Sequence, residues 1–412
     1  MKVVGLVTEY NPFHKGHLYH MEKSKQLTGA DYCICVMSGN FVQRGTPAII
    51  DKWNRAKSAL LSGMDIVIEL PIHYSVSSAE FFASAAVSLL HNTGVVDSIC
   101  FGSELGSLDK LDALADIFIE EPRDYKMLLQ AHLKSGHNFP SARSLALNDY
   151  EGDSYSEIIN NPNNILGIEY LKALKRLKSH IKAYTIERIG AGYHDNSSDV
   201  NIASATAIRN QIQTASSPQN ADIENMLPSE SYSILKAGIS NKQAPVFPAD
   251  VFALLRYKLL CTPEKQLANI LDISEGLENR IKTAIKSANS YDELIDMLMT
   301  RRYPKTKLHR ALIHILLDID KNSFDVFSNN GYSQYIRVLG FRKDAQALMR
   351  KIKHNSSLPV LGKIKGSEKA LTSLQQKMLT DEIRATEIYN TIILNKYNIK
   401  MKNDYSIPLI MV

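Results

Sequence analysis

The sequence has few of the features that characterise disulfide-rich or metal-binding proteins. Its 412 residues include four cysteines, and no two of them form a Cys-x-x-Cys pair. This scarcity argues against a disulfide framework and against a structural zinc site. Cys33, Cys35 and Cys100 lie in apolar runs typical of strands, so we expect buried, unreactive thiols at these positions.

Long apolar runs are also missing. No stretch of about 18 apolar residues is present, which argues against a membrane-spanning helix. The apolar run that begins the chain turns polar at Thr8-Glu9 and is too short for a signal peptide. Hydrophobic residues make up 44% and charged residues 22%, a balance that excludes a mainly disordered or collagen-like chain. We therefore expect a cytoplasmic protein that does not associate with membranes.

No charge of one sign dominates the whole chain, because 48 basic residues face 43 acidic ones and the net charge is +5. Residues 301–365, however, contain 14 basic and 4 acidic residues, a local excess of +10. A local excess of this size indicates a polyanionic partner, although a solvated helical surface is the simpler alternative. The candidate residues in this segment for contact with a nucleic acid are Arg342, Lys343, Arg350, Lys351 and Lys353. Four aromatic residues of this segment are candidates for stacking on bases, with a place in the core as the alternative: Tyr303, Tyr332, Tyr335 and Phe341.

The first half of the chain alternates strand-like and helix-like segments. Apolar runs predict strands over 2–8, 31–37, 65–70, 97–102 and 181–188. Helical spacing covers 16–28, 51–63, 78–91 and 163–178, and a loop is expected over 190–201. Strands that are apolar on both faces and separated by helices predict an α/β fold with a Rossmann-like, doubly wound parallel sheet. Such a sheet binds ligands beyond the carboxyl ends of its strands.

The second half has a different pattern. A Ser/Pro/Asn-containing linker at 215–221 separates a predicted catalytic domain, 1–215, from a predicted domain of residues 222–412. No convincing strand alternation follows the linker, so we expect an all-helical C-terminal domain. Its predicted helices are 249–261, 276–288, 291–299, 307–319, 343–353 and 373–393.

The strongest motif follows the first predicted strand, where the chain reads TEYNPFHKGH. His14 and His17 lie three residues apart, on one face of the opening turn of a helix, with Lys15 and Gly16 between them. A helix N-terminus offers free N–H groups to phosphate, and a glycine there lets a ligand approach the backbone. The two imidazoles can donate hydrogen bonds to phosphate oxygens as charge builds during displacement at phosphorus. His-x-G-His alone occurs often by chance, and its place after the first strand of an α/β chain makes it a candidate site.

A second phosphate-binding candidate, SATAIR, lies near the end of the α/β part. Ser204 and Thr206 begin a predicted helix, and Arg209 follows one turn later. Hydroxyl and N–H groups can hold phosphate oxygens, and an arginine can neutralise their charge. The alternative is an ordinary helix cap with a surface arginine.

Longer stretches carry a resemblance to a known family. GLVTEYNPFHKGHLYH, VMSGNFVQRGTPAIIDKWNRAKSALLSGMDIVIELP, FGSE and NNPNNILGIEYLKAL resemble the bacterial tRNA(Met) cytidine acetate ligases, within the HIGH-type nucleotidyltransferase superfamily. The resemblance runs through the α/β half and is weaker in the helical half.

The resemblance implies an activity and a set of residues. Such enzymes form acetyl-adenylate from acetate and ATP, and then acetylate N4 of the wobble cytidine, position 34, of elongator tRNA(Met) to give N4-acetylcytidine. The catalytic residues it implies are His14, Lys15 and His17. The implied ATP-binding residues are Val7, Thr8, Glu9, Tyr10, Asn11, Pro12, Phe13, His14, Lys15, Gly16, His17, Leu18, Tyr19, His20, Gly102, Asn161, Asn164 and Arg188, with Ser204, Thr206 and Arg209 added by the second motif. Mg²⁺ is expected to bind together with ATP. The sequence contains no cluster of carboxylates that would indicate which residues coordinate it.

The loop after the second predicted strand adds one more candidate. Arg44, in SGNFVQRG, lies on the expected ligand edge and is a candidate contact for phosphate or RNA, unless this is an ordinary connecting loop. Two other functions share the motif: a small-molecule adenylyltransferase and a non-catalytic RNA-binding factor. The basic segment favours the tRNA enzyme over the former, and the intact histidines favour it over the latter. The sequence leaves the oligomeric state open.

Overall fold

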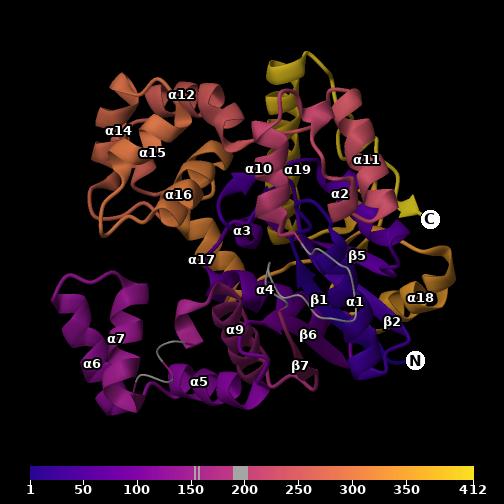
Figure 1. The fold of residues 1–412 in the computed structure, drawn as a ribbon, viewed down its shortest axis with the longest axis horizontal. Helices are drawn as coiled ribbons and strands as arrows, with labels where there is room; N and C mark the ends of the chain where they lie inside the picture. Colours follow the sequence, from indigo (N-terminus) through magenta and orange to yellow (C-terminus); the bar gives the residue numbers. More distant parts are fainter. Residues whose placement is uncertain (153–154, 156–157, 189–202) are drawn as a thin grey trace.

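A computed structural model describes residues 1–152, 155, 158–188 and 203–412. At its centre is a mixed eight-stranded sheet with the order β10-β8-β5-β2-β1-β6-β7, in which β9 pairs with β8 (Figure 1). Five neighbouring strands run parallel: β1 (Val3–Thr8), β2 (Tyr32–Ser38), β5 (Ile66–Leu70), β6 (Ser98–Ser103) and β7 (Lys182–Glu187). These are the five strands expected from the sequence, so the parallel, Rossmann-like sheet is confirmed. The loop expected over 190–201 lies outside the described residues.

Helices cover both faces of the parallel strands, as a doubly wound fold requires. Successive residues of a strand point to opposite faces, so Cys33 and Cys35 of β2 pack toward one layer and Ile34 and Val36 toward the other. The first layer contains α1 (Lys15–Thr28) and α2 (Lys52–Leu61). The second contains α4 (Ala79–Asn92), α5 (Leu108–Glu120) and α9 (Pro162–Arg176). Cys33, Cys35 and Cys100 are buried, as predicted.

The second half of the chain is mostly helical and has a core of its own. The helices of this core are α12 (Phe252–Cys261), α14 (Leu277–Ser287), α15 (Tyr291–Leu298) and α16 (Lys305–Leu317), which group together at one side of the sheet (Figure 1). The long helix α19 (Ser373–Tyr397) joins this core to the sheet, because Met378 and Leu379 pack in the sheet core and Ile392 and Ile393 in the helical one. None of the described helices is long and apolar enough to cross a membrane.

One expectation about the second half needs correction, because it is not exclusively helical. It supplies β8 (Ile336–Phe341), β9 (Val360–Leu361) and β10 (Ile410–Met411) to the central sheet. All six residues of β8 are buried, including Arg337, whose charge interrupts the apolar pattern that would have revealed the strand. β8 is also antiparallel to β5, so it does not belong to the alternating strand–helix series. The domain boundary predicted between residues 215 and 222 stays a prediction. Segments from both sides of it contribute strands to the same sheet.

Candidate active site at the carboxyl edge of the sheet

The site is built around the loop that follows β1. Asn11 is buried in this loop and its side-chain oxygen accepts a hydrogen bond from the Ile49 N–H at 2.7 Å. Its backbone oxygen accepts a hydrogen bond from Arg209 at 2.7 Å. The buried aromatic side chains of Tyr10 and Phe13 pack edge to face, 4.7 Å apart. The loop is therefore held from several directions before the chain enters α1.

The two histidines of the motif lie together at the start of α1. His14 is the N-cap residue, and its Nδ1 accepts a hydrogen bond from the Gly16 N–H at 3.1 Å. The His14 N–H in turn donates to Nδ1 of His17 at 3.3 Å, and the two rings stack with centroids 3.7 Å apart. A backbone N–H can only donate, so both Nδ1 atoms accept and each neutral ring carries its proton on Nε2.

Both rings are neutral at physiological pH. Burial, together with the nearby charges of Arg188 and Arg209, lowers the pKa of His14 to about 4. Burial is also the main cause that lowers the pKa of His17 well below its ordinary value. Within the described residues, no hydrogen bond is made to Nε2 of either ring. The motif thus presents two Nε2–H donors, with Lys15 beside them as the first residue of α1.

Two arginines bring positive charge to the same edge. Arg209, on α10 (Ala205–Thr214), donates to the Asn11 carbonyl and to the Thr206 hydroxyl, the latter at 3.1 Å. Arg188 follows β7 and is exposed, and its Cγ lies 3.0 Å from where a Cβ on Gly102 would stand. A side chain at position 102 would therefore displace Arg188. The fold thus brings His14, Arg188 and Arg209 together from three distant segments.

The hydroxyl and amide candidates differ in how they are used. Ser204 caps α10 by accepting a hydrogen bond from the Ala207 N–H at 3.1 Å, which matches the alternative weighed for it. Asn164 is buried: its oxygen accepts from the Leu105 N–H and its amide donates to the Ile158 carbonyl, both at 3.0 Å. Asn164 therefore braces the loop after β6, and the exposed Asn161, the N-cap residue of α9, is the better ligand candidate.

Arg44 lies in a hairpin formed by β3 (Phe41–Val42) and β4 (Thr46–Pro47). The hairpin is attached to the loop after β1, because the Gln43 N–H donates to the Glu9 carboxylate at 2.7 Å. Gly45 has φ +75° and packs directly on the backbone of α16 at Arg310. Arg44 is exposed. Burial is the main cause that lowers the pKa of Arg209; the charge of Glu9 raises it, and the charge of Arg44 lowers it further. Arg44 therefore belongs to the edge that carries the histidines.

The basic residues predicted to contact RNA lie elsewhere. Because β8 is antiparallel to β5, Arg342 comes after the end of β8 that pairs with the start of β5, and its N–H donates to the Asp65 carbonyl. This is the edge of the sheet opposite the histidines, about 15–20 Å away along a five-residue strand. Lys343 and the residues of α18 (Gln346–Asn355) follow it, and Arg350, Lys351 and Lys353 are exposed. Arg342 itself is ion-paired with Asp344 at 2.6 Å.

The aromatic residues of the basic segment are not available to stack on bases. Tyr303, Tyr335 and Phe341 are buried in hydrophobic cores, and Tyr332 packs against Tyr74. The alternative that assigned them to the core is therefore correct. The sequence could not distinguish the two roles. Aromatic residues alternate with basic ones in both cases, whether they stack on bases or lie in the core beneath a basic surface.

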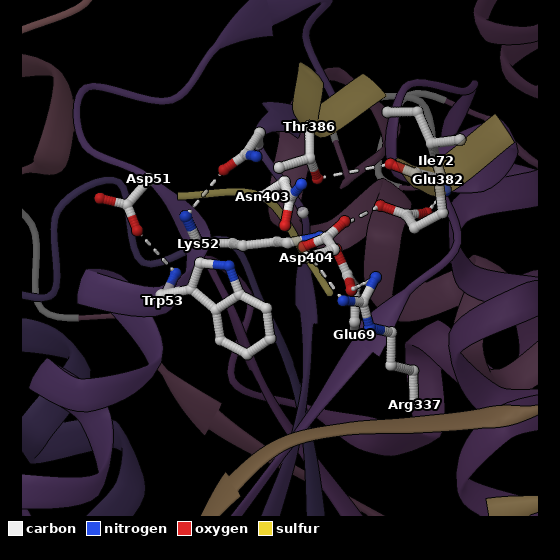
Figure 2. A network of polar contacts seen from close by, with 12 residues as sticks. Asp51, Lys52, Trp53, Glu69, Ile72, Arg337, Glu382, Thr386, Asn403 and Asp404 are labelled. Atoms are coloured by element: carbon white, nitrogen blue, oxygen red, sulfur yellow. Dashed lines mark hydrogen bonds and ion pairs between the residues drawn. The ribbon is translucent and has the colours of Figure 1, made fainter. Parts of the chain in front are cut away.

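Figure 2 shows a buried ionic network that the sequence did not reveal. It lies against the turn that follows β2, because a Cβ on Gly39 would stand 2.8 Å from a Glu69 oxygen. Lys52 Nζ lies 2.8 Å from Glu69 and 3.3 Å from Asp404, and Arg337 reaches the same two carboxylates at 3.0 and 3.1 Å. Glu382, from α19, accepts a hydrogen bond from the Ile72 N–H at 2.7 Å. The network therefore ties the first turn of α2 to β5, β8, α19 and the C-terminal segment.

The network contains two cations and three carboxyl groups, and its pKa shifts show how it reaches neutrality. The charges of Arg337 and Lys52 outweigh burial and lower the pKa of Glu69. Lys52 and Arg337 do the same for Asp404. Burial and the neighbouring charge of Glu69 raise the pKa of Glu382 well above its ordinary value, so Glu382 is the carboxyl group of the network that most favours its protonated form.

Other contacts of the site were also missed by sequence reasoning. Glu104 accepts hydrogen bonds from the Asn163 side chain, at 2.5 Å, and from the Asn164 N–H, at 2.9 Å. Asn163 also accepts from Arg188 at 3.4 Å. Both residues lie in stretches that carry the family resemblance, FGSE and NNPNNILGIEYLKAL, and this was the available signal.

Comparisons with known proteins agree with the fold. A family model described as HIGH Nucleotidyl Transferase matches residues 1–404. The curated tRNA(Met) cytidine acetate ligase of Acetivibrio thermocellus is 45% identical over 392 residues, which is 94% of both chains. That of Caldanaerobacter subterraneus subsp. tengcongensis is 42% identical over 411 residues, covering both chains completely. The crystal structure of Thermotoga maritima TmcAL bound with alpha-thio ATP has 33% identity and a TM-score of 0.92, and the match covers 100% of this chain and 99% of that one.

Proposed function

Because the chain belongs to the HIGH nucleotidyltransferase family and, within it, to the tRNA(Met) cytidine acetate ligases, we propose that it activates acetate with ATP and acetylates tRNA(Met). In the first step an acetate oxygen attacks the α-phosphorus of ATP, the bond to the bridging oxygen breaks, and pyrophosphate leaves. In the second step N4 of the wobble cytidine of elongator tRNA(Met) attacks the acetyl carbonyl carbon. AMP leaves and N4 loses a proton, which gives N4-acetylcytidine.

The observation that carries the proposal is the pair of Nε2–H donors on His14 and His17, with the positive charges of Arg188 and Arg209 nearby. Displacement at phosphorus needs alignment and stabilisation of the developing negative charge, and it needs no side-chain nucleophile. Donors fixed in advance at a helix N-terminus supply this stabilisation without reorganising during the reaction. We assign Arg188, Arg209 and Lys15 to the phosphate oxygens.

The metal fits this scheme as a companion of ATP. The described residues contain no group of three His, Cys, Asp or Glu side chains placed to hold a metal ion. Mg²⁺ commonly keeps several waters and takes its remaining ligands from substrate phosphates and one or two carboxylates. We therefore propose that Mg²⁺ binds with ATP and neutralises charge on the leaving pyrophosphate.

The tRNA is assigned to two surfaces. At the edge of the histidines, we assign the exposed Arg44 to the arriving cytidine or its flanking phosphates. At the opposite edge, Lys343, Arg350, Lys351 and Lys353 provide a second positive surface for the phosphate backbone. A cytoplasmic location follows from this substrate and belongs to the same proposal.

The test is the reaction itself. Protein, ATP, labelled acetate and elongator tRNA(Met) are incubated, the tRNA is digested, and nucleosides are separated by chromatography with mass detection. We expect labelled N4-acetylcytidine with wild-type protein and none with His17→Ala, whose tRNA affinity should stay within about twofold of wild type. AMP transfer to a phosphorylated metabolite without labelled tRNA would establish the small-molecule alternative. The absence of ATP turnover would leave only an RNA-binding role.

A further inference from the structure

A buried arginine that the sequence motifs do not include connects the loops of the active edge. Arg55 lies on α2 and is 1% exposed. Its side chain donates to the Glu9 carbonyl after β1 at 2.5 Å, and to the Ser38 carbonyl after β2 at 3.1 Å. It also donates to the Gly39 carbonyl and, at 3.1 Å, to the Ile50 carbonyl. One guanidinium group therefore holds three separate segments of chain.

This arrangement is costly for a residue whose only task is stability. Burying a cation carries a large desolvation penalty, which an ion pair usually offsets in part. Within the described residues, Arg55 is held by carbonyl oxygens and forms no ion pair with a carboxylate. Four of its five N–H groups are used, and the planar fork of arginine fixes their directions. Lysine cannot reproduce this geometry.

Two of the three segments held by Arg55 are the loops that border the proposed nucleotide site. Glu9 opens the loop that leads to His14, and Ser38 and Gly39 form the turn that leads to the Arg44 hairpin. Both loops leave neighbouring parallel strands at their carboxyl ends, since β1 pairs with β2. The distance between these loops determines the width of the opening in which a nucleotide lies.

The other end of this connection is firmly anchored. Asp51 caps α2 by accepting from the Trp53 and Asn54 N–H groups at 3.0 and 3.1 Å. The Lys52 N–H donates to the Asn40 side chain at 2.8 Å, and its ammonium group enters the buried network of Figure 2. The first turn of α2 therefore cannot shift without breaking several buried contacts, and Arg55 transmits this rigidity to the two loops.

We propose that Arg55 is a positioning residue of the adenylation reaction, which sets the separation of the loops after β1 and β2 and thereby the placement of ATP against the histidines. The inference rests on the proposed function, which it deepens. Arg55 lies below the loops and touches their backbone, so it acts through them and not on the substrate. Misplacement of reacting groups by about 1 Å can reduce a rate by about 100-fold.

The experiment compares Arg55→Lys and Arg55→Ala with Ser58→Ala as a control. Ser58 lies on the same helix, is 5% exposed, and donates only to the Asn54 carbonyl, away from the loops. Calorimetry measures the dissociation constant for ATP, acetate-dependent pyrophosphate exchange measures adenylation, and filter binding measures tRNA affinity. Active-site titration corrects each rate for the fraction of folded enzyme.

For Arg55→Lys we expect weaker ATP binding by about tenfold and slower exchange per active site by about 100-fold, with unchanged tRNA affinity. Ethylguanidinium should restore part of the exchange rate to Arg55→Ala, and Ser58→Ala should resemble wild type. The proposal is overturned if Arg55→Lys binds ATP and exchanges pyrophosphate normally per active site, or if ATP and tRNA affinity fall together. Because ATP binding is measured without acetate or tRNA, it tests Arg55 even if the wild-type protein proves not to activate acetate.

Discussion

The protonation of the buried network can be tested by removing one carboxyl charge at a time. Glu69 forms ion pairs with both cations, Lys52 at 2.8 Å and Arg337 at 3.0 Å, and its side chain is 1% exposed. Glu69→Gln leaves these two buried cations with too little negative charge, and removing one partner of a buried ion pair typically costs about 3–5 kcal/mol. Asp404→Asn should cost a similar amount, because Asp404 also contacts both cations.

Glu382→Gln should behave differently, because folding raises the pKa of Glu382 and so favours its neutral form, which glutamine mimics. A glutamine oxygen can accept from the Ile72 N–H as the carboxyl group does, and the amide can donate to Glu69 in place of the acid proton. We therefore expect a change of less than about 1 kcal/mol. Urea denaturation at pH 7 measures all three variants. The exposed pair Arg302–Glu275, at 3.2 Å, gives the control Glu275→Gln, which should change stability by less than about 1 kcal/mol.

The pH dependence of the same variants provides a second check. The pKa values of Glu69 and Asp404 are lowered by folding from 4.5 and 3.8, so their stabilisation is present above these unfolded values and is lost as pH falls through the native values. The pKa of Glu382 is raised, so its stabilisation is present at low pH and is lost as pH rises through the native value. Glu382→Gln should remove this loss at high pH. A cost for Glu382→Gln equal to that for Glu69→Gln would refute the proposed charge balance.

Three further outcomes follow from the geometry. Replacing Arg350, Lys351 and Lys353 with alanine should leave acetate-dependent pyrophosphate exchange unchanged, and should reduce the salt dependence of tRNA binding by about one unit of log–log slope per lost phosphate contact, as measured by filter binding. Folding lowers the pKa of His14 from 6.5 to about 4, so the unfolded chain binds more protons in this interval; stability measured by urea denaturation should therefore decrease as pH falls from 6.5 to 4, less steeply in His14→Gln. Asn164→Ala should destabilise the protein by about 2–4 kcal/mol in the same assay, because it leaves the Leu105 N–H and the buried Ile158 carbonyl unpaired.

The parallel part of the fold could be predicted because it depends on local pattern. β1, β2, β5, β6 and β7 are apolar runs separated by helices, and each was placed to within about two residues. β8 could not be predicted in this way, because Arg337 interrupts its apolar run and its burial depends on Glu69, far away in the sequence. The basic excess counted over residues 301–365 also depends on contacts that the sequence does not show. It includes Arg337, which is buried and ion-paired and therefore adds no charge to the surface.

The candidate site shows a similar division. His14 and His17 could be found because a strand, a loop and a helix N-terminus are consecutive in the sequence, and their tautomers then follow from the local turn. The structural roles of Arg55 and Asn164 depend on their hydrogen-bond partners, which are backbone groups of other segments. Such partners produce no recognisable pattern of residues in the sequence. Backbone carbonyls carry no sequence identity, so a side chain that recognises them is invisible until the chain is folded. For this reason the candidate ligand-binding residues could be proposed from the sequence, whereas the residues that hold the loops in place required the structure.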